Sequence, residues 1–277
     1  MLARIKRSVA YVTIKEWKKA AARKVALPRY LGSELACPVC GVHLRAFKPI
    51  WKSYLRHARE FGYVHSVYDI ETLNLAAYSC PACDAADRER LYALYFDRIL
   101  PTLDRTRRYR LVEFAPGPGR ALQRKLQDHP FIEYRSADLV LQTVDDRLDI
   151  TDMRPYADAS VDFFLCSHVL EHVRDDRKAM RELHRILKPG GFGIVMVPLV
   201  HGLEETQEDP AVDTPELRWK YYGLGDHVRQ YGKRDFLARL AGAGFQVDQL
   251  GLDYFGKDPF HRAGIADDSV LYVVRRE

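Results

Sequence analysis

The sequence of 277 residues lacks long hydrophobic runs and strong compositional bias. Its longest nearly uninterrupted apolar stretch, residues 192–200, is far shorter than the roughly 20 residues that cross a bilayer, so we expect no transmembrane segment. The 17 Gly and 14 Pro residues are too few for collagen or a low-complexity chain. Residues 1–30 contain no apolar core segment, from which we expect no secretory signal peptide and a reducing, cytoplasmic setting.

Cysteine is also scarce, since the chain has only five, but four of them form two C-P-x-C pairs. Cys37 and Cys40 form the first pair, and Cys80 and Cys83 form the second. In a reducing compartment such pairs indicate metal ligands more often than disulfides. Two thiolate pairs brought together make a closed tetrahedral site of the structural zinc type. We therefore predict one zinc ion bound by these four cysteines, with redox cysteines as the alternative.

Charge is distributed unevenly along the chain, whose net charge is +5. Residues 1–110 contain 21 Lys and Arg against 10 Asp and Glu, whereas residues 111–277 contain 22 against 28. A basic front and an acidic rear indicate parts with different roles. We divide the chain into a basic arm (residues 1–30), a zinc-binding module with a connecting helix (residues 31–104) and a larger domain (residues 105–277).

The basic arm has a single acidic residue, Glu16, and apolar residues at near-helical spacing. This pattern predicts a basic amphipathic helix that ends at Pro28. Such a helix could attach to an anionic surface at the inner face of a membrane, or to nucleic acid. A solvated arm or a contact in a homo-oligomer explains the same pattern, and the sequence leaves these alternatives open.

From residue 105 onward, short apolar runs alternate with helical patterns. Strands are predicted at residues 110–114, 132–137, 161–166, 193–197, 246–250 and 269–275, and helices at residues 121–127, 176–187 and 234–243. The Pro-Gly-Gly sequence at residues 189–191 is expected to separate a helix from the next strand, and residues 198–232 interrupt the alternation. Alternating strands and helices imply right-handed βαβ units and a mostly parallel sheet, so the predicted fold class is α/β.

A glycine turn, Gly117-Pro118-Gly119, follows the first strand of this domain, where a βα turn brings the backbone close to a ligand. Asp138 follows the next strand, 19 residues after Gly119. An acidic residue near this position binds ribose hydroxyls in nucleotide-binding folds. The prolines at positions 116 and 118 have no N–H groups to offer a pyrophosphate, so the pattern favours a cofactor without phosphates over a dinucleotide.

Residues 109–277 resemble the class I S-adenosylmethionine-dependent methyltransferases, in particular the methyltransferase type 11 group. The resemblance rests on the turn E-F-A-P-G-P-G, on Asp138, on the dipeptide D-I at residues 149–150, on V-D-F-F-L-C-S-H-V-L-E-H-V at residues 161–173, and on L-H-R-I-L-K-P-G-G at residues 183–191. It implies a doubly wound, mostly parallel, seven-stranded Rossmann-like sheet with S-adenosylmethionine as the cofactor. The short segment between Asp138 and Asp149 is expected to reduce the helix that the family usually has there.

The resemblance assigns the methionine end of the cofactor to the glycine turn. Glu113 would face the amino group, and Gly117 and Gly119 would admit the backbone of the cofactor. Ala115 stands where the family commonly has glycine, a small change that should still allow the turn.

The resemblance assigns the rest of the cofactor to residues that follow the next strands. Asp138 would bind the ribose hydroxyls, while Asp149 and Ile150 would bracket the adenine. Ser167 and His168 would lie beside the sulfonium and the methyl acceptor.

The segment G-L-G-D-H-V-R-Q-Y-G at residues 223–232 resembles a sequence found after the fifth strand in a bacterial subset of this family. It lies in the insertion at residues 198–232, which by analogy covers the acceptor site as a lid. His227 is predicted to be a general base oriented by Asp226, and Arg229 to hold an anionic acceptor. A structural Asp–His–Arg network that orders the lid is the alternative.

Three further histidines are expected around the pocket. His168 is a second candidate for catalysis, and His201 is a candidate for acceptor binding. His172, within L-E-H-V, fits a helix cap or a core hydrogen-bond partner as well as a functional role.

Similar paired C-P-x-C segments, each with a following Arg-rich helix like residues 87–95, precede methyltransferase domains in bacterial surface-polysaccharide gene neighbourhoods. This resemblance implies that the zinc-binding module at residues 31–104, which we call the front module, recognises the acceptor. It also favours O-methylation of a small-molecule or carbohydrate acceptor in polysaccharide biosynthesis. The alternative is an RNA methyltransferase whose basic zinc module binds the phosphate backbone, although the chain has no N-P-P-Y-type motif. The glycine turn and Asp138 argue against a binding protein that retains only the fold.

Overall fold

The computed structural model describes residues 22–117 and 119–277. Most of the helix predicted for the basic arm lies outside the described residues. Its described end is helical at residues 22–26 and continues as a short 3-10 helix, η1, at Leu27–Tyr30. Among the described helices, none has the length and apolar character needed to cross a membrane.

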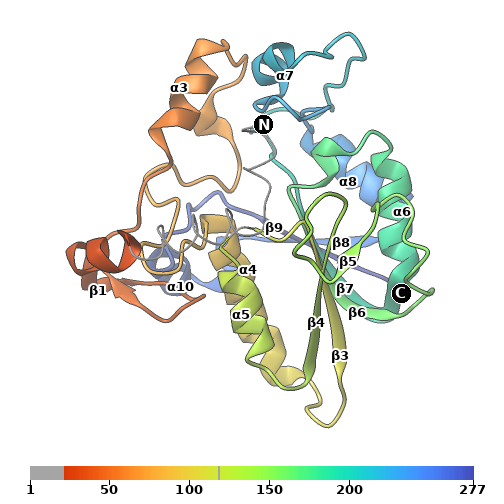
Figure 1. The fold of residues 1–277 in the computed structure, drawn as a ribbon, viewed down its shortest axis with the longest axis horizontal. Coiled ribbons are helices and arrows are strands. Elements are labelled where there is room, and N and C mark those ends of the chain that lie inside the picture. Colours follow the sequence, from red (N-terminus) through yellow and green to blue (C-terminus); the bar gives the residue numbers. More distant parts are fainter. Residues whose placement is uncertain (1–21, 118) are drawn as a thin grey trace.

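A seven-stranded sheet forms the centre of the molecule, with the strand order β5-β4-β3-β6-β7-β9-β8 (Figure 1). The first five strands in this order pair in parallel, and β9 runs antiparallel between β7 and β8. The strands are β3 (Tyr109–Phe114), β4 (Ile132–Asp138), β5 (Asp146–Arg147), β6 (Val161–Ser167), β7 (Leu187–Met196), β8 (Gln246–Leu250) and β9 (Leu271–Arg275). The prediction of an α/β fold with a mostly parallel seven-stranded sheet is confirmed.

Helices cover both faces of this sheet (Figure 1). α4 (Asp87–Ile99) and α5 (Ala121–Gln127) lie on one side, and α6 (Asp176–Ile186) and α8 (Lys233–Gly242) lie on the other. Between β4 and β5 the described residues form turns without a helix, as the short spacing predicts. The smaller elements of the chain are β1 (Leu31–Ala36), β2 (His43–Leu44), α3 (Lys52–Glu60), η2 (Val67–Asp69), η3 (Leu100–Thr102), η4 (Leu170–His172), α7 (Pro215–Tyr222), α9 (Leu252–Phe255) and α10 (Lys257–Arg262).

Strand β7 begins earlier than the sequence predicts, directly after α6. Leu187 pairs with Val161, and Phe192 pairs with Phe163, so the residues between Leu187 and Phe192 form a bulge against β6. The bulge accommodates Pro189, which has no N–H for the ladder, and Gly190, whose φ is +74°. The prediction that Pro-Gly-Gly separates helix from strand is therefore wrong, because this sequence lies inside the strand.

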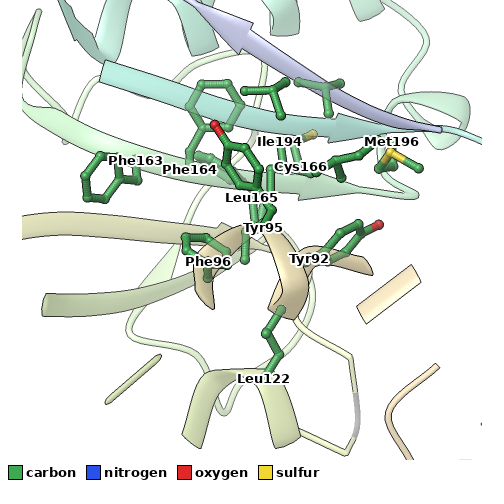
Figure 2. Close-up of a cluster of buried hydrophobic side chains, with 14 of the residues drawn as sticks. Tyr92, Tyr95, Phe96, Leu122, Phe163, Phe164, Leu165, Cys166, Ile194 and Met196 are labelled. Atoms are coloured by element: carbon green, nitrogen blue, oxygen red, sulfur yellow. The ribbon is translucent and has the colours of Figure 1, made fainter. Parts of the chain in front are cut away.

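Helix α4 connects the front of the chain to the core of the sheet. Its aromatic side chains Tyr92, Tyr95 and Phe96 point at the central strands (Figure 2). The ring of Tyr95 lies edge-on to Phe192 of β7, with 5.3 Å between the ring centroids. Buried residues of the front module, including Leu44 between the two cysteine pairs, belong to the same continuous hydrophobic cluster. The front module and the sheet are therefore stabilised by one shared core.

Arg90 of α4 is fully buried and acts as a cross-link in this core. Its guanidinium lies 3.9 Å from the centre of the Phe47 ring. It donates hydrogen bonds to the backbone carbonyls of Ala77, Tyr78, Ala85, Ala263 and Gly264. This positive charge holds three segments of the chain together and is not available to an external partner.

Candidate active site

A cavity of about 420 Å³, the strand-end cavity, opens at the carboxyl ends of β3, β4 and β6. In open α/β sheets, ligands bind outside this edge of the strands. Five of the residues that the sequence assigns to the cofactor or to catalysis line it: Ala115, Asp138, Asp149, Ile150 and His168. Asp226 lines it from the insertion at residues 198–232.

The carboxylates in the strand-end cavity are held by their own loops. Oδ1 of Asp138 accepts hydrogen bonds from the N–H groups of Val140 and Leu141, at 2.6 and 2.7 Å. Oδ1 of Asp149 accepts one from the N–H of Thr151 at 2.8 Å. Among the described residues, Oδ2 of Asp138 has no side-chain or backbone donor, so it is free to accept a ligand hydroxyl.

The turn after β3 places Ala115 in a backbone conformation that glycine adopts more easily. Ala115 has a φ of +51°, in the left-handed region, where a Cβ costs roughly 1–2 kcal/mol. Gly117 and Gly119 are not among the residues that line the cavity. A Cβ at Gly119 would lie 3.6 Å from the Cys83 carbonyl oxygen, so this turn is adjacent to the second cysteine pair.

Glu113 lies behind this turn and does not line the cavity. The hydroxyl of Tyr134 donates a hydrogen bond to its Oε2 at 2.5 Å. Burial raises the pKa of Glu113 to about 7. The carboxyl group is therefore balanced between its neutral and charged forms at neutral pH.

Replacing Glu113 by Gln should stabilise the cofactor-free protein at pH 8 and have little effect at pH 4.5. The stability that the neutral Glu113 carboxyl contributes is present below its ordinary pKa of 4.5 and is lost as the pH rises through about 7. Because Gln stays neutral, the variant should gain roughly 2–3 kcal/mol in free energy of unfolding at pH 8. Urea unfolding at the two pH values measures this difference, and an equal difference at both would contradict the pKa assignment.

A second cavity of about 290 Å³, the aromatic cavity, adjoins the first, and His168 and His172 line both. One wall comes from the front module and carries Trp51, Tyr54 and Tyr78. The opposite wall comes from the insertion and includes Tyr222, Gly223, Leu224, His227 and Gln230. Arg88 is the sole Lys or Arg side chain among the described lining residues. Sequence reasoning did not identify this aromatic wall, because its residues come from segments far apart in the chain.

The two walls contact each other at the rim, where α3 and α7 lie side by side (Figure 1). Trp219 of α7 stacks on Phe61, with 5.7 Å between centroids and 18° between planes. Deeper in, the Tyr63 hydroxyl donates a hydrogen bond to Oε1 of Gln230 at 3.0 Å. The front module and the insertion therefore enclose the aromatic cavity together.

Local sequence signals place α7 in this wall. The Thr214 hydroxyl accepts a hydrogen bond from the N–H of Leu217, which caps the first turn, and Pro215 occupies the first helical position. Gly223, with a φ of +79°, ends the helix. The chain then turns so that residues 224–230 run back along the cavity.

His168 stands at the end of β6 between the two cavities. Its φ is +55°, an uncommon conformation for a residue with a Cβ, and its N–H donates to the Met196 carbonyl at 2.8 Å. Burial, together with Arg88, lowers the pKa of the His168 imidazole, which keeps the ring neutral at pH 7. The neighbouring Ser167 hydroxyl is hydrogen-bonded to the Tyr92 hydroxyl at 2.7 Å and does not line either cavity.

His227 is buried, and its ring is oriented by the backbone. Its Nδ1 lies 2.9 Å from the Tyr222 carbonyl oxygen. Because a carbonyl only accepts, Nδ1 carries the proton, and Nε2 of the neutral ring carries a lone pair. Asp226 is mostly exposed, and its Oδ2 lies 3.6 Å from Nδ1 of His172. The group that orients His227 is therefore the Tyr222 carbonyl and not, as the sequence predicts, Asp226.

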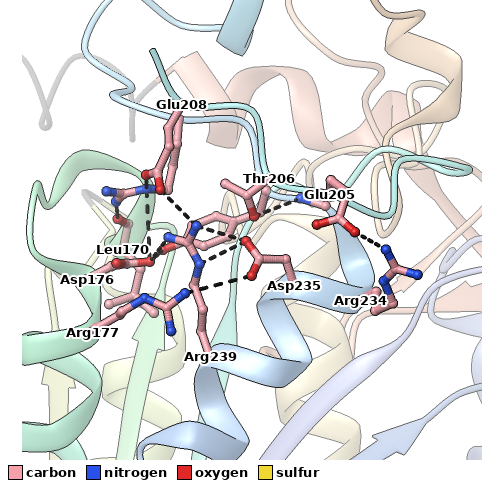
Figure 3. Close-up of polar contacts among 12 residues, drawn as sticks. Leu170, Asp176, Arg177, Glu205, Thr206, Glu208, Arg234, Asp235 and Arg239 are labelled. Atoms are coloured by element: carbon pink, nitrogen blue, oxygen red, sulfur yellow. Dashed lines mark hydrogen bonds and ion pairs between the residues drawn. The ribbon is translucent and has the colours of Figure 1, made fainter. Parts of the chain in front are cut away.

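Arg229 lies in a buried polar network under the insertion. Its guanidinium donates to Oε2 of Glu208 at 2.7 Å and to the carbonyls of Leu170, Val173 and Arg174. Figure 3 shows the next arginine of this network, Arg239, between Asp176, Glu208 and Asp235. With these donors occupied, the geometry favours the structural network over the predicted contact of Arg229 with an acceptor.

His201 also lies away from the two cavities. Its Nε2 is 2.9 Å from Oδ2 of Asp268, and both side chains are partly exposed. It is not among the lining residues of either cavity, so the geometry gives no support to an acceptor contact.

Glu171 is a further residue of this site to which the sequence analysis assigned no role. It is fully buried, lines the aromatic cavity, and neither of its carboxylate oxygens accepts a hydrogen bond from a described residue. Nδ1 of His168 lies 3.2 Å from Oε1. Burial acts to raise the pKa of Glu171, but the neighbouring histidines lower it to about 2. The available signal was the L-E-H sequence directly after β6, at the edge of the sheet where ligands bind.

The four paired cysteines meet in one cluster, in which Cys37 and Cys80 are buried. The Sγ atoms of Cys37 and Cys83 are 3.7 Å apart, and those of Cys40 and Cys80 are 3.8 Å apart. No disulfide joins these cysteines. Four sulfurs bound to one zinc ion at about 2.3 Å with tetrahedral angles lie about 3.8 Å from each other, so these spacings fit such a site.

Comparisons with known proteins find similarity to methyltransferases. Residues 99–195 match a family model described as a methyltransferase domain. A Mycolicibacterium smegmatis protein described as a probable S-adenosylmethionine-dependent methyltransferase is 32% identical over 114 residues, which cover 41% of this chain and 37% of that protein. The thiol S-methyltransferase TMT1B of Rattus norvegicus is 32% identical over 87 residues, which cover 30% of this chain and 34% of that protein.

Among solved structures, the CMeT domain of the citrinin polyketide synthase is 19% identical, with a TM-score of 0.46, covering 72% of this chain and 54% of that one. This chain spans about a third to a half of the length of the curated relatives that it matches. The family model and these relatives agree that part of this chain is similar to methyltransferase domains.

Proposed function

We propose that this chain O-methylates a small-molecule or carbohydrate acceptor that binds in the aromatic cavity. The observation that carries the proposal is that His168 and His172 line both cavities. A methyl donor in the strand-end cavity and an acceptor in the aromatic cavity would meet at these two side chains. The volume of the aromatic cavity, about 290 Å³, suits a group of monosaccharide size.

The residues of the strand-end cavity fit S-adenosylmethionine, whose sulfonium supplies an activated methyl group when it is bound. The free Oδ2 of Asp138 would accept ribose hydroxyls, and the apolar side chain of Ile150 would contact the adenine beside Asp149. Ala115, at the turn after β3, would let the chain pass close to the methionine part.

In the proposed reaction, the hydroxyl oxygen of the acceptor attacks the methyl carbon in line with the sulfur. S-adenosylmethionine would supply the methyl group, and its sulfur would leave as the neutral thioether S-adenosylhomocysteine. The hydroxyl proton passes to the imidazole of His168, which lines both cavities.

The walls of the aromatic cavity favour a ring-shaped acceptor. Trp51 packs edge-on against Tyr78 at 5.1 Å, and such aromatic faces stack on sugar or aromatic rings. Arg88 donates to the Tyr78 hydroxyl at 3.2 Å and adds a positive charge to the cavity, which suits an acceptor with an anionic group. An RNA acceptor is less well supported, because Arg23 and Lys48 of the basic front are paired with Asp84.

We also propose that the cysteine cluster binds a structural zinc ion. The sulfur–sulfur distances and the position of Cys83 beside Gly119 support this assignment. The zinc would fix the second cysteine pair behind the glycine turn, and would thereby stabilise the turn as well as the module.

Replacing Trp51 by Ala should raise the KM for the acceptor about 10-fold, which corresponds to roughly 1.4 kcal/mol, and leave the KM for S-adenosylmethionine unchanged. Trp51 is 60% exposed, so the change should not disturb folding. Tyr68→Ala is the matched control, since Tyr68 belongs to the same segment, is 77% exposed and does not line the cavity. Initial rates against the acceptor measure both constants, and equal acceptor KM values for the two variants would contradict the proposed acceptor site.

A further inference from the structure

The buried Glu171 has imidazole rings beside it, but no described residue gives its carboxylate a well-aligned hydrogen bond. Its side chain is 0% exposed, and both carboxylate oxygens are without a hydrogen bond from the described residues. Burying an ionised carboxylate without a compensating partner costs several kcal/mol. In the described part of the chain, the basic side chains within 4.0 Å of it are limited to His168 and His227.

The imidazole of His227 presents a lone pair to this carboxylate. Its Nδ1 donates to the Tyr222 carbonyl, so the neutral ring has no proton on Nε2, which lies 4.0 Å from Oε1 of Glu171. A protonated Nε2 would not hydrogen-bond to Oε1 either, because 4.0 Å exceeds the 2.7–3.2 Å range of N–H···O bonds. Two electron-pair donors therefore face each other across a gap that a cation would fill.

His172 completes the cluster from the other side. Its ring lies edge-on to the ring of His227, with 4.7 Å between centroids. One nitrogen of each ring and one oxygen of Glu171 lie within 4.8 Å of one another. Ligand atoms about 2.1 Å from one metal ion are roughly 3–4 Å apart, so small rotations of these side chains would bring them into coordination.

We propose that Glu171, His172 and His227 bind a divalent metal ion between the two cavities. One carboxylate oxygen and two imidazole nitrogens form a ligand set that suits Mn²⁺, Fe²⁺, Co²⁺ or Zn²⁺. Three protein ligands leave coordination positions open, as in catalytic metal sites, whereas the four cysteines form a closed site. Both histidines also line the aromatic cavity, so an open position would face the acceptor.

The surroundings support the ligand set in the way that outer partners of metal ligands do. The Tyr222 carbonyl fixes the tautomer and the orientation of His227. Asp226 lies beside Nδ1 of His172, which gives this predicted catalytic residue a supporting position. The N–H of Val228 donates to the backbone carbonyl of Glu171 at 2.8 Å, so the insertion holds His227 next to the carboxylate.

If the protein is an O-methyltransferase as proposed, the ion also indicates which class of acceptor binds. A bound cation polarises a coordinated hydroxyl and lowers its pKa, so the oxygen gives up its proton more readily as it attacks the methyl carbon. An acceptor with two adjacent oxygen atoms would occupy two open positions at once. We therefore infer that the acceptor is a vicinal diol or a comparable pair of neighbouring oxygens on a ring.

Binding of Mn²⁺ to the full chain tests the proposal without cofactor or acceptor. The protein is first loaded with one equivalent of Zn²⁺, because thiolates prefer zinc, and free Mn²⁺ is then followed by electron paramagnetic resonance. We expect one Mn²⁺ per chain in the wild type, with an affinity that falls at least about tenfold in Glu171→Gln and in His227→Gln. In the matched control Asp162→Asn, Mn²⁺ affinity should be unchanged, since buried Asp162 lines neither cavity and already has Lys188 and the N–H of Arg110 as partners.

Thermal unfolding distinguishes a metal ligand from a residue that only stabilises the fold, because replacing the latter would lower the melting temperature without any metal. With the cysteine site loaded with zinc and no Mn²⁺ added, Glu171→Gln should be at least as stable as the wild type, because the change removes a buried charge without a hydrogen bond. Wild-type protein that binds no Mn²⁺, or Glu171→Gln protein that binds it as the wild type does, would overturn the metal site. Because these readouts do not involve methyl transfer, a negative result would leave the proposed O-methylation to be judged by its own assay.

Discussion

Replacing Asp138 by Ala should lower the affinity for S-adenosylhomocysteine at least about 100-fold. The free carboxylate oxygen of Asp138 would accept ribose hydroxyls, and each hydrogen bond to a charged group contributes about 1.5–3 kcal/mol. The other oxygen holds the N–H groups of Val140 and Leu141, whose loop lines the same cavity, so the variant loses both the contact and the shape of the loop. Isothermal titration calorimetry with the full chain measures the change.

Asp158→Asn provides the matched control for this prediction. Asp158 is a surface carboxylate, 75% exposed, that pairs with Arg185 and lines neither cavity. Its replacement should leave the affinity for S-adenosylhomocysteine within about twofold of the wild type, because exposed ion pairs contribute little. An Asp138→Ala protein that binds as tightly as this control would exclude the strand-end cavity as the cofactor site.

Replacing Cys80 by Ser should remove one zinc ion per chain and lower the melting temperature by at least about 10 °C. Zinc binding is coupled to the folding of small modules, and each kcal/mol lost shifts the melting temperature of a chain of this size by roughly 2–4 °C. Because Cys83 lies against Gly119, the affinity for S-adenosylhomocysteine should fall as well. Metal analysis, thermal unfolding and calorimetry on the same samples measure the three effects.

Cys166→Ala is the control for Cys80→Ser, because it removes a buried thiol that is not a proposed zinc ligand. Cys166 is fully buried in β6, as the sequence predicts, and lies outside the cysteine cluster. Its replacement should cost roughly 1 kcal/mol and leave the zinc content at one per chain. Wild-type protein that is stably folded without zinc would refute the proposed zinc site.

The sequence predicts most of the fold because its signals are local. The alternation of apolar runs and helical patterns defines the strands of the sheet, and the short spacing between Asp138 and Asp149 predicts the missing helix. The bulge at residues 188–191 was not predictable in this way. Pro189 and Gly190 usually interrupt a strand, and here the pairing resumes on the far side of them because the following residues are buried against β6.

The candidate site was predictable only where it follows the strand ends. Ala115, Asp138, Asp149 and His168 lie together because the carboxyl ends of parallel strands meet at one edge of the sheet. The aromatic cavity depends instead on contacts such as Trp219 with Phe61, which join segments more than 150 residues apart and leave no local pattern. The sequence alone allowed a functional role for Arg229, because it does not reveal that backbone carbonyls accept hydrogen bonds from the Arg229 guanidinium.

The most direct test of the account is transfer of a labelled methyl group from S-adenosylmethionine to a panel of sugars, nucleotide sugars, glycans and RNA. We predict that the wild-type protein methylates a hydroxyl of a ring-shaped small molecule or carbohydrate, and that Asp138→Ala and Trp51→Ala both reduce this transfer at limiting substrate. Mass spectrometry of the products identifies the methylated oxygen. Transfer to RNA alone, or to a sugar with equal efficiency in wild-type and Trp51→Ala protein, would contradict the proposed acceptor site.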